Sequence, residues 1–270
     1  MPAIPRRVRR LALLLTFVLG LHAPAVMAEL RIAVAANFSH TLQQLVDTYS
    51  ALNPEFSATL SSASSGKHFA QIRQGAPFDL FFSADDQRTA DLVAQGNAHP
   101  DSRFVYALGQ LALWSPDPDA VPTDGMALLK TAEFRRLAIA NPRVAPYGSA
   151  AEALLRDNGI QLQRGQLITG QSIGQAFNFV SSGNAELGLV AASQVLLHEQ
   201  QHPPGSYWLP PATSYPAIVQ EAIILNTASN KPTATRFMRW LRCDAQAHRI
   251  IRADGYLLPA ADTEAACAGY

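Results

Sequence analysis

The sequence predicts an α/β protein built on parallel sheets. Between residues 30 and 93, short apolar runs alternate three times with segments of helical periodicity, which is typical of successive strand–helix units. The runs at 30–36 and 80–82 are apolar at nearly every position, as in strands that are buried on both faces. Small polar residues stand where each strand gives way to a helix. These three observations together indicate parallel strands whose ends meet along one edge.

The elements follow in order along the chain. Strands are predicted over residues 30–36, 56–60, 80–83, 104–108, 111–114, 137–140, 187–191 and 218–225. Helices are predicted over residues 38–52, 67–74, 85–93, 235–241 and 247–253, with three more that end near Gly159, Gly183 and Gln201. Asn37 is a good N-cap for the first helix, and Ser149 to Glu152 forms a capping box for a helix in the middle of the chain.

The N-terminal segment predicts export. Four arginines precede an apolar run over residues 11–21, and Val26-Met27-Ala28 then offers small residues to a signal peptidase. We expect a signal peptide over residues 1–28, cleaved after Ala28, and a soluble periplasmic protein. The paired arginines leave the Sec and twin-arginine routes both open.

Removal of this segment changes the net charge. The whole chain has 21 basic and 21 acidic residues, and the four arginines of the signal leave 21 − 4 = 17 basic residues, so the mature chain carries −4. This balance argues against a nucleic-acid partner. It also means that overall charge does not attract an anion.

Cys243 and Cys267 are the two cysteines of the sequence, and neither belongs to a CxxC pair. In an exported protein they could pair. We therefore expect a disulfide that holds the C-terminal tail against the last helices.

Four polar corners between strands and helices suggest an anion site. They are Ala36-Asn37, Ser64-Ser65-Gly66, Tyr147-Gly148-Ser149 and Ser172-Ile173-Gly174. Each offers backbone N–H groups at a helix start, where the helix dipole favours negative charge. In parallel sheets such corners gather at the carboxyl ends of the strands, where ligands bind. Each corner alone is better explained as a well-capped helix, but four of them together favour a shared site.

A competing hypothesis is a zinc hydrolase. His198-Glu199-Gln200-Gln201-His202 matches the HExxH pattern, in which two histidines on one helix face bind zinc and the glutamate acts as base. Glu221 could be a third ligand. Against this hypothesis, Pro203-Pro204 ends the helix at the second histidine.

Two further motifs resemble catalytic or nucleotide-binding sequences. Gly170-Gln171-Ser172-Ile173-Gly174 matches GxSxG, but the preceding strand is weak and no upstream oxyanion loop is present, so a helix start is the preferred interpretation. Ser65-Gly66-Lys67-His68 resembles the end of a Walker A loop, but His68 stands where Ser or Thr would hold magnesium. We discard both.

The sequence as a whole resembles the periplasmic molybdate-binding proteins of ABC transporters. The similarity covers nearly the whole mature chain in order, and the segment 71–86 is the most specific. The matching segments are AVAANF (33–38), SSASSG (61–66), QIRQGAPFDLFFSADD (71–86), ANPRVAPYG (140–148), SIGQA (172–176), LGLVA (187–191) and GYLLP (255–259). The resemblance implies a two-lobed, type II solute-binding protein with an oxyanion in the cleft between its lobes.

The resemblance also implies a set of ligand residues. It places them at Asn37, Ser65, Tyr147 and the backbone N–H of Ile173, with Ser64 as the alternative to Ser65. Many family members carry a tyrosine where this chain has Ala191. In this chain the hydroxyl of Tyr147, at a different corner, would replace the hydroxyl of that tyrosine.

The implied organisation has two lobes. We expect lobe one to comprise residues 29–109 and 215–270, and lobe two to comprise residues 110–214. The resemblance implies a monomeric binding protein rather than an enzyme, without a cofactor, that passes molybdate or tungstate to a membrane permease.

Overall fold

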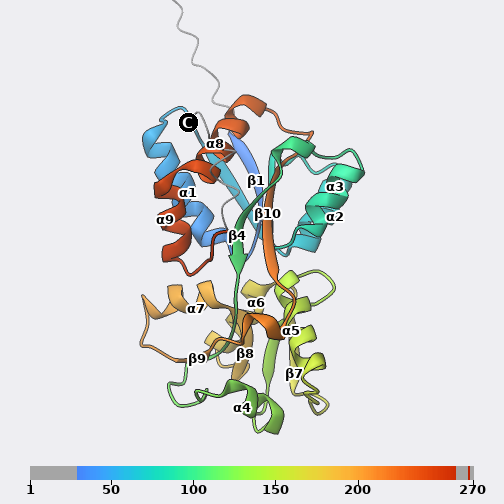
Figure 1. Cartoon of the computed structure of the whole chain (residues 1–270), viewed down its shortest axis with the longest axis vertical. Helices are drawn as coiled ribbons and strands as arrows, with labels where there is room; N and C mark the ends of the chain where they lie inside the picture. The colour runs from blue at the N-terminus through green and yellow to red at the C-terminus, as the bar shows by residue number, and fades with distance from the viewer. Residues whose placement is uncertain (1–28, 260–266, 268–270) are drawn as a thin grey trace, which may run out of the picture.

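The computed structural model describes residues 29–259 and residue 267, and it forms two lobes that each contain a five-stranded sheet (Figure 1). The predicted signal peptide lies outside the described residues. Among the helices that are described, none is long and apolar enough to cross a membrane.

The sheet of lobe one has the strand order β2-β1-β3-β10-β4. Its strands are β1 (Leu30–Ala35), β2 (Ala58–Ala63), β3 (Leu80–Ser83), β4 (Phe104–Gly109) and β10 (Ile218–Ile224). Its helices are α1 (Ser39–Leu52), α2 (Ser65–Arg73), α3 (Gln87–Ala94), α8 (Lys231–Cys243) and α9 (Ala245–Ala253), with the 3₁₀ turn η1 (Pro100–Ser102). β1 pairs in parallel with β2 and β3, whereas β10 runs antiparallel to β3 and β4.

The sheet of lobe two has the order β7-β6-β8-β5-β9. Its strands are β5 (Leu111–Ser115), β6 (Leu137–Ala140), β7 (Leu167–Gly170), β8 (Leu187–Ala191) and β9 (Ser206–Trp208). Its helices are α4 (Gly125–Thr131), α5 (Pro146–Asp157), α6 (Ile173–Ser181) and α7 (Ala192–Glu199). β6 is parallel to β7 and β8, and β5 is antiparallel to β8 and β9. The predicted fold of two lobes with flanking helices is confirmed, but each sheet is mixed, with two parallel and two antiparallel strand pairs among the described residues, where mostly parallel sheets were predicted.

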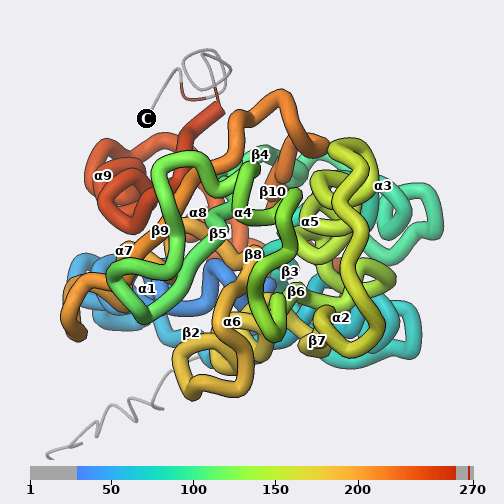
Figure 2. The backbone as a smooth tube through the Cα atoms, turned by 90° about the horizontal axis from the view of Figure 1, so that it is seen from below, coloured from blue at the N-terminus to red at the C-terminus, as the bar shows by residue number. Residues whose placement is uncertain are grey.

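Two connections join the lobes. β4 ends at Gly109 and β5 starts at Leu111 in the other sheet, while the chain returns through η2 (Ala212–Ser214) to β10. The exact boundaries after residues 109 and 214 stay a prediction. In both views α7 lies on the same side of the molecule as α9, and α5 lies on the side of α2 (Figure 1, Figure 2).

The small-residue run differs from its predicted structure. β2 does not end at Leu60 but continues through Ser61 and Ser62, which pair with Ala33 and Val34 of β1. The neighbouring strand supplies these serines with backbone partners, which overrides their low strand propensity. As a result α2 begins at Ser65, two residues before the predicted start.

Two elements, α4 and β9, lie in segments for which no helix or strand was predicted. α4 is capped by Asp124, whose Oδ1 accepts a hydrogen bond from the N–H of Ala127 at 3.1 Å. β9 is a three-residue edge strand on β5. Both are short, so periodicity gave little signal for them.

An aromatic cluster fixes the end of β1. Phe38 is fully buried, and its ring centroid lies 4.4 Å from that of Tyr106 and 5.2 Å from that of Tyr256. Because Asn37 directly precedes Phe38, this packing also holds Asn37 in place.

The predicted disulfide is confirmed. Cys243, at the end of α8, is bonded to Cys267 with the two Cα atoms 5.6 Å apart. The bond closes a loop with a sequence separation of 24 residues. It therefore fastens the end of the chain to lobe one.

We expect that replacing both cysteines by serine lowers the free energy of unfolding. In the chain-entropy model a loop of this length contributes about 3.5 kcal/mol, because the bond restricts the unfolded chain. Urea titration of the oxidised protein and of the Cys243→Ser/Cys267→Ser variant measures the difference. Equal unfolding midpoints would show that the bond contributes nothing to stability.

Candidate functional site

A small cavity lies between the lobes, at the four predicted corners. Its volume is about 10 Å³. The residues that line it are Ala35, Ala36, Asn37, Ser64, Ser65, Ala84, Ala145, Pro146, Tyr147 and Ile173. All four predicted ligand residues are among them, and none of the lining side chains is charged. A larger hollow of about 430 Å³ beside α8 shares no residue with this cavity, so size alone does not identify the site.

Ser65 is the first residue of α2 and offers a free hydroxyl proton. Its Oγ accepts a hydrogen bond from the N–H of Ala84 at 2.9 Å, and the side chain is fully buried. In this bond the hydroxyl oxygen of Ser65 is the acceptor, so its own proton can be donated to a ligand. Ser64, the extended N-cap of α2, also lines the cavity, so both serines stay candidates.

Tyr147 brings a buried hydroxyl from the first turn of α5. The oxygen has no hydrogen-bond partner among the described residues. Burial raises the pKa of this hydroxyl well above its ordinary value, so it keeps its proton at neutral pH. A Cβ added to Gly109 would lie 2.2 Å from the hydroxyl, which therefore sits against the strand that connects the lobes.

Three helices begin at the cavity. α6 starts at Ile173 after its N-cap Ser172, whose Oγ accepts from the N–H of Gln175 at 3.2 Å. The N–H of Ile173 therefore remains among the unpaired donors of the first turn. Together with the starts of α2 and α5, this turn brings positive dipole ends to the cavity without a charged side chain.

Asn37 is held by two long-range hydrogen bonds. Its Nδ2 donates to Oε1 of Gln220 at 2.7 Å and to the hydroxyl of Tyr256 at 3.1 Å. Both amide protons are then used, and the buried Oδ1 has no partner among the described residues. In this orientation the amide offers an acceptor, not the donor that was predicted.

A paired rotation of two amides restores the donor. Nε2 of Gln220 is also buried without a partner in the described part of the chain. If both amides rotate by 180°, Gln220 donates to Asn37 across the same 2.7 Å contact, and Nδ2 of Asn37 becomes free. Oδ1 of Asn37 then faces the hydroxyl of Tyr256, which donates its one proton either to this oxygen or to the backbone carbonyl of Asn37. The hydroxyl of Tyr106, 3.3 Å from Gln220, can accept in that arrangement while it donates to the carbonyl of Ser83.

Sequence reasoning missed Gln220 and Tyr256 as supports of Asn37. Tyr256 lies in a segment that carried the family resemblance, but nothing local gave it a role. Gln220 is a polar residue inside an apolar strand, and this was the one signal that pointed to it.

The geometry does not support the hydrolase alternative. The rings of His198 and His202 are stacked, with centroids 4.1 Å apart and planes 6° from parallel, so their nitrogens do not converge on one point. α7 ends at Glu199, before the second histidine. The described residues contain no group of three side chains arranged to hold a metal ion.

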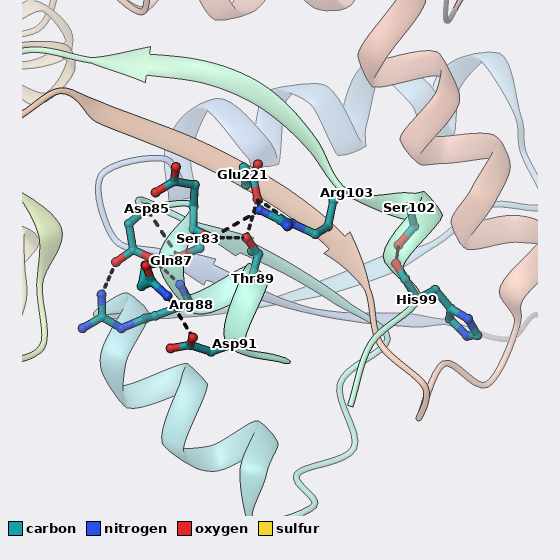
Figure 3. Close-up of polar contacts among 11 residues, drawn as sticks. Ser83, Asp85, Gln87, Arg88, Thr89, Asp91, His99, Ser102, Arg103 and Glu221 are labelled. Carbon is teal, nitrogen blue, oxygen red and sulfur yellow. Dashed lines mark hydrogen bonds and ion pairs between the residues drawn. The ribbon is translucent and has the colours of Figure 1, made fainter. Parts of the chain in front are cut away.

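Glu221 serves a different purpose from the metal ligand that was considered. It is on β10 of lobe one, where its carboxylate accepts from Arg103 at 2.6 and 2.9 Å and also contacts Thr89 (Figure 3). This partly buried ion pair joins β10 to the start of β4, and the contact with Thr89 joins it to α3.

The GxSxG motif is a helix start, as expected. The hydroxyl of Ser172 caps α6 by accepting from Gln175. A capping serine of this kind is explained by the helix that it begins.

Comparisons with known proteins agree with the geometry. A family model described as bacterial extracellular solute-binding protein matches residues 30–257. The molybdate-binding protein ModA of Rhodobacter capsulatus is 39% identical over 258 residues, which are 95% of this chain and 99% of that protein. The ModA protein of Azotobacter vinelandii is 39% identical over 85% of this chain and 90% of its own length.

Solved structures show the same fold. The periplasmic molybdate-binding protein of Azotobacter vinelandii aligns with a TM-score of 0.80 and 40% identity, over 86% of this chain and 100% of that one. The sulfate-binding protein SubI of Mycobacterium tuberculosis H37Rv aligns with a TM-score of 0.68 and 15% identity, over 89% of this chain and 88% of that one, which shows the fold alone. The chain therefore belongs to the bacterial extracellular solute-binding proteins, in the molybdate-binding protein family that its motifs resemble.

Proposed function

We propose that this protein captures molybdate, and also tungstate, between its lobes and delivers it to the membrane permease of an ABC transporter. The observation that carries the proposal is the uncharged cavity at which α2, α5 and α6 begin. The names of the relatives that match nearly the full chain support the choice of oxyanion.

The donors suit a dehydrated dianion. A tetrahedral oxyanion that leaves water must exchange its hydration for protein donors, and charged acceptors make the stronger hydrogen bonds. Ser65 and Tyr147 supply hydroxyls, Ile173 supplies a backbone N–H, and Asn37 supplies its amide after the rotation described above. Because these groups are neutral, the helix dipoles provide the positive potential.

The cavity implies that the lobes move. A volume of about 10 Å³ is close to what one water molecule needs, and four oxygens around a metal atom need more. We infer that the lobes separate to admit the anion and close again to a slightly wider spacing. Such closure is a hinge motion that a permease can recognise.

The remaining parts of the proposal concern context. We infer that the protein acts as a binding protein without catalysis and as a monomer, with no nucleic-acid partner. It would work in the periplasm after cleavage behind Ala28. The extracellular solute-binding family supports the exported location.

The proposed function is tested by calorimetric titration of the purified protein with molybdate, tungstate, sulfate and phosphate. Saturable binding of the first two is the expected result. If none of the four anions gives a heat of binding, the proposal is overturned.

We expect Tyr147→Phe to weaken molybdate binding while the fold stays intact. The hydroxyl is buried with no protein partner among the described residues, and the loss of a hydrogen bond to a charged group costs about 1.5–3 kcal/mol. This corresponds to a roughly 10- to 150-fold higher dissociation constant. Tyr207→Phe, at a half-exposed tyrosine on β9, is the matched control. If both variants bind as the unmodified protein does, the hydroxyl of Tyr147 does not reach the anion.

We also expect the site to reject sulfate. Sulfate has the same charge as molybdate but is smaller, so donors on the two lobes cannot all reach it at the lobe spacing that molybdate requires. Two or three unmade hydrogen bonds at about 1–3 kcal/mol each weaken binding by about thirtyfold or more. Molybdate is titrated into protein held in millimolar sulfate. Displacement of molybdate by sulfate would indicate a general sulfate-type binder.

A further inference from the structure

The hydroxyl of Tyr256 lies where Asn37 and lobe two meet. It donates to the backbone carbonyl of Asn37 at 2.7 Å, and the side chain of Asn37 lies 3.1 Å from it. Oγ of Ser193 donates to the same hydroxyl at 2.9 Å. One oxygen therefore contacts a residue of the cavity and a residue of the opposite lobe.

Lobe one fixes the position of Tyr256 from several sides. The ring is 2% exposed and packs edge-on against Phe38. The preceding Asp254 accepts a buried hydrogen bond from Thr41 of α1 at 2.7 Å. The following Leu257 pairs with Leu108 of β4. The hydroxyl is thus held at a defined point beside the end of β1.

Ser193 comes from the other lobe. It is buried in the first turn of α7, which follows β8. Close packing surrounds the contact, since a Cβ added to Gly255 would lie 2.4 Å from Leu196 of α7. Figure 1 shows the end of α9 facing α7 across the junction of the lobes. The Ser193–Tyr256 hydrogen bond therefore forms only when the lobes approach each other on this side.

A second hydrogen bond crosses between the lobes beside the cavity. The N–H of Gly66, in α2, donates to the carbonyl of Val144 at 2.8 Å. This bond involves backbone only and adjoins Ser65. The contact through Tyr256 differs because it adjoins Asn37 and depends on two side chains that can be changed individually.

We propose that Tyr256 is a positioning residue that holds Asn37 for the ligand and, through Ser193, couples this orientation to closure of lobe two. The proposal deepens the proposed function and rests on it. The proposal has a kinetic consequence. Contacts that exist only in the closed form lower the dissociation rate of the anion and leave its association rate unchanged.

The experiment measures molybdate binding to the unmodified mature protein, to three single variants and to one double variant. Ser193→Ala removes the contact from lobe two, and Tyr256→Phe removes the hydroxyl but keeps the ring; the double variant combines them. Thr89→Val is the control, because it deletes a buried hydrogen bond to Glu221 within lobe one without touching Tyr256, Asn37 or lobe two. Calorimetry gives the dissociation constant, stopped-flow exchange gives the dissociation rate, and thermal melts without ligand report the stability of each variant.

We expect Ser193→Ala to raise the dissociation rate about threefold or more and Tyr256→Phe about tenfold, since the latter also frees Asn37. Association rates should stay the same. The double variant should match Tyr256→Phe alone, because Ser193 has no partner once the hydroxyl is gone. Thr89→Val should lower the melting temperature but leave the dissociation rate unchanged.

Three results would overturn the proposal. They are unchanged dissociation rates in both Ser193→Ala and Tyr256→Phe, strictly additive effects in the double variant, or an equal effect of Thr89→Val on the dissociation rate. If Tyr256→Phe does not fold, Ser193→Ala alone decides the question. Failure of the unmodified protein to bind molybdate would instead contradict the proposed function.

Discussion

An oxyanion that leaves water for a protein interior loses the hydrogen bonds of all its oxygens, and protein donors must replace them. In the proposed function this chain meets the demand without a counter-charge, because helix starts supply N–H groups and aligned dipoles. Parallel strand–helix units place such starts at one edge of each sheet. The order of strands and helices in both lobes thus follows from the need to collect donors at a single cavity.

Donors from two lobes reach one small cavity only if the backbones approach closely, and glycine makes this possible at two places. A Cβ on Gly66 would lie 2.8 Å from Cα of Val144 in the other lobe. A Cβ on Gly109 would collide with the hydroxyl of Tyr147. Larger residues would hold the lobes apart at the serine corner and would displace the tyrosine at the connecting strand. The same packing that closes the cavity therefore restricts which residues can surround it.

The features that could be predicted from the sequence are those that depend on residues close together in the chain. The corners at Asn37, Ser65, Tyr147 and Ile173 were predictable because strand ends are local features. Two predicted caps were wrong. Phe38, not Asn37, is the N-cap of α1. The helix α5 begins at Pro146, so Ser149 lies inside the helix that it was expected to cap. The surroundings of Asn37 were not, since Gln220 and Tyr256 lie 183 and 219 residues away along the chain. The sequence also could not show whether Oδ1 or Nδ2 of Asn37 is free to bind a ligand, because that depends on the hydrogen bonds of the folded structure.

The two connections between the lobes explain how a local site can control a global motion. They are joined to each other, because Gly109 pairs with Ile218 and the N–H of Leu111 donates to the hydroxyl of Tyr215 at 3.2 Å. Two connections held side by side favour rotation about a common axis over sliding. Rotation changes the distance between the corners of lobe one and those of lobe two at the same time. In the proposed function, the angle between the lobes then reports whether an anion holds them together, and a permease would need to read only that angle.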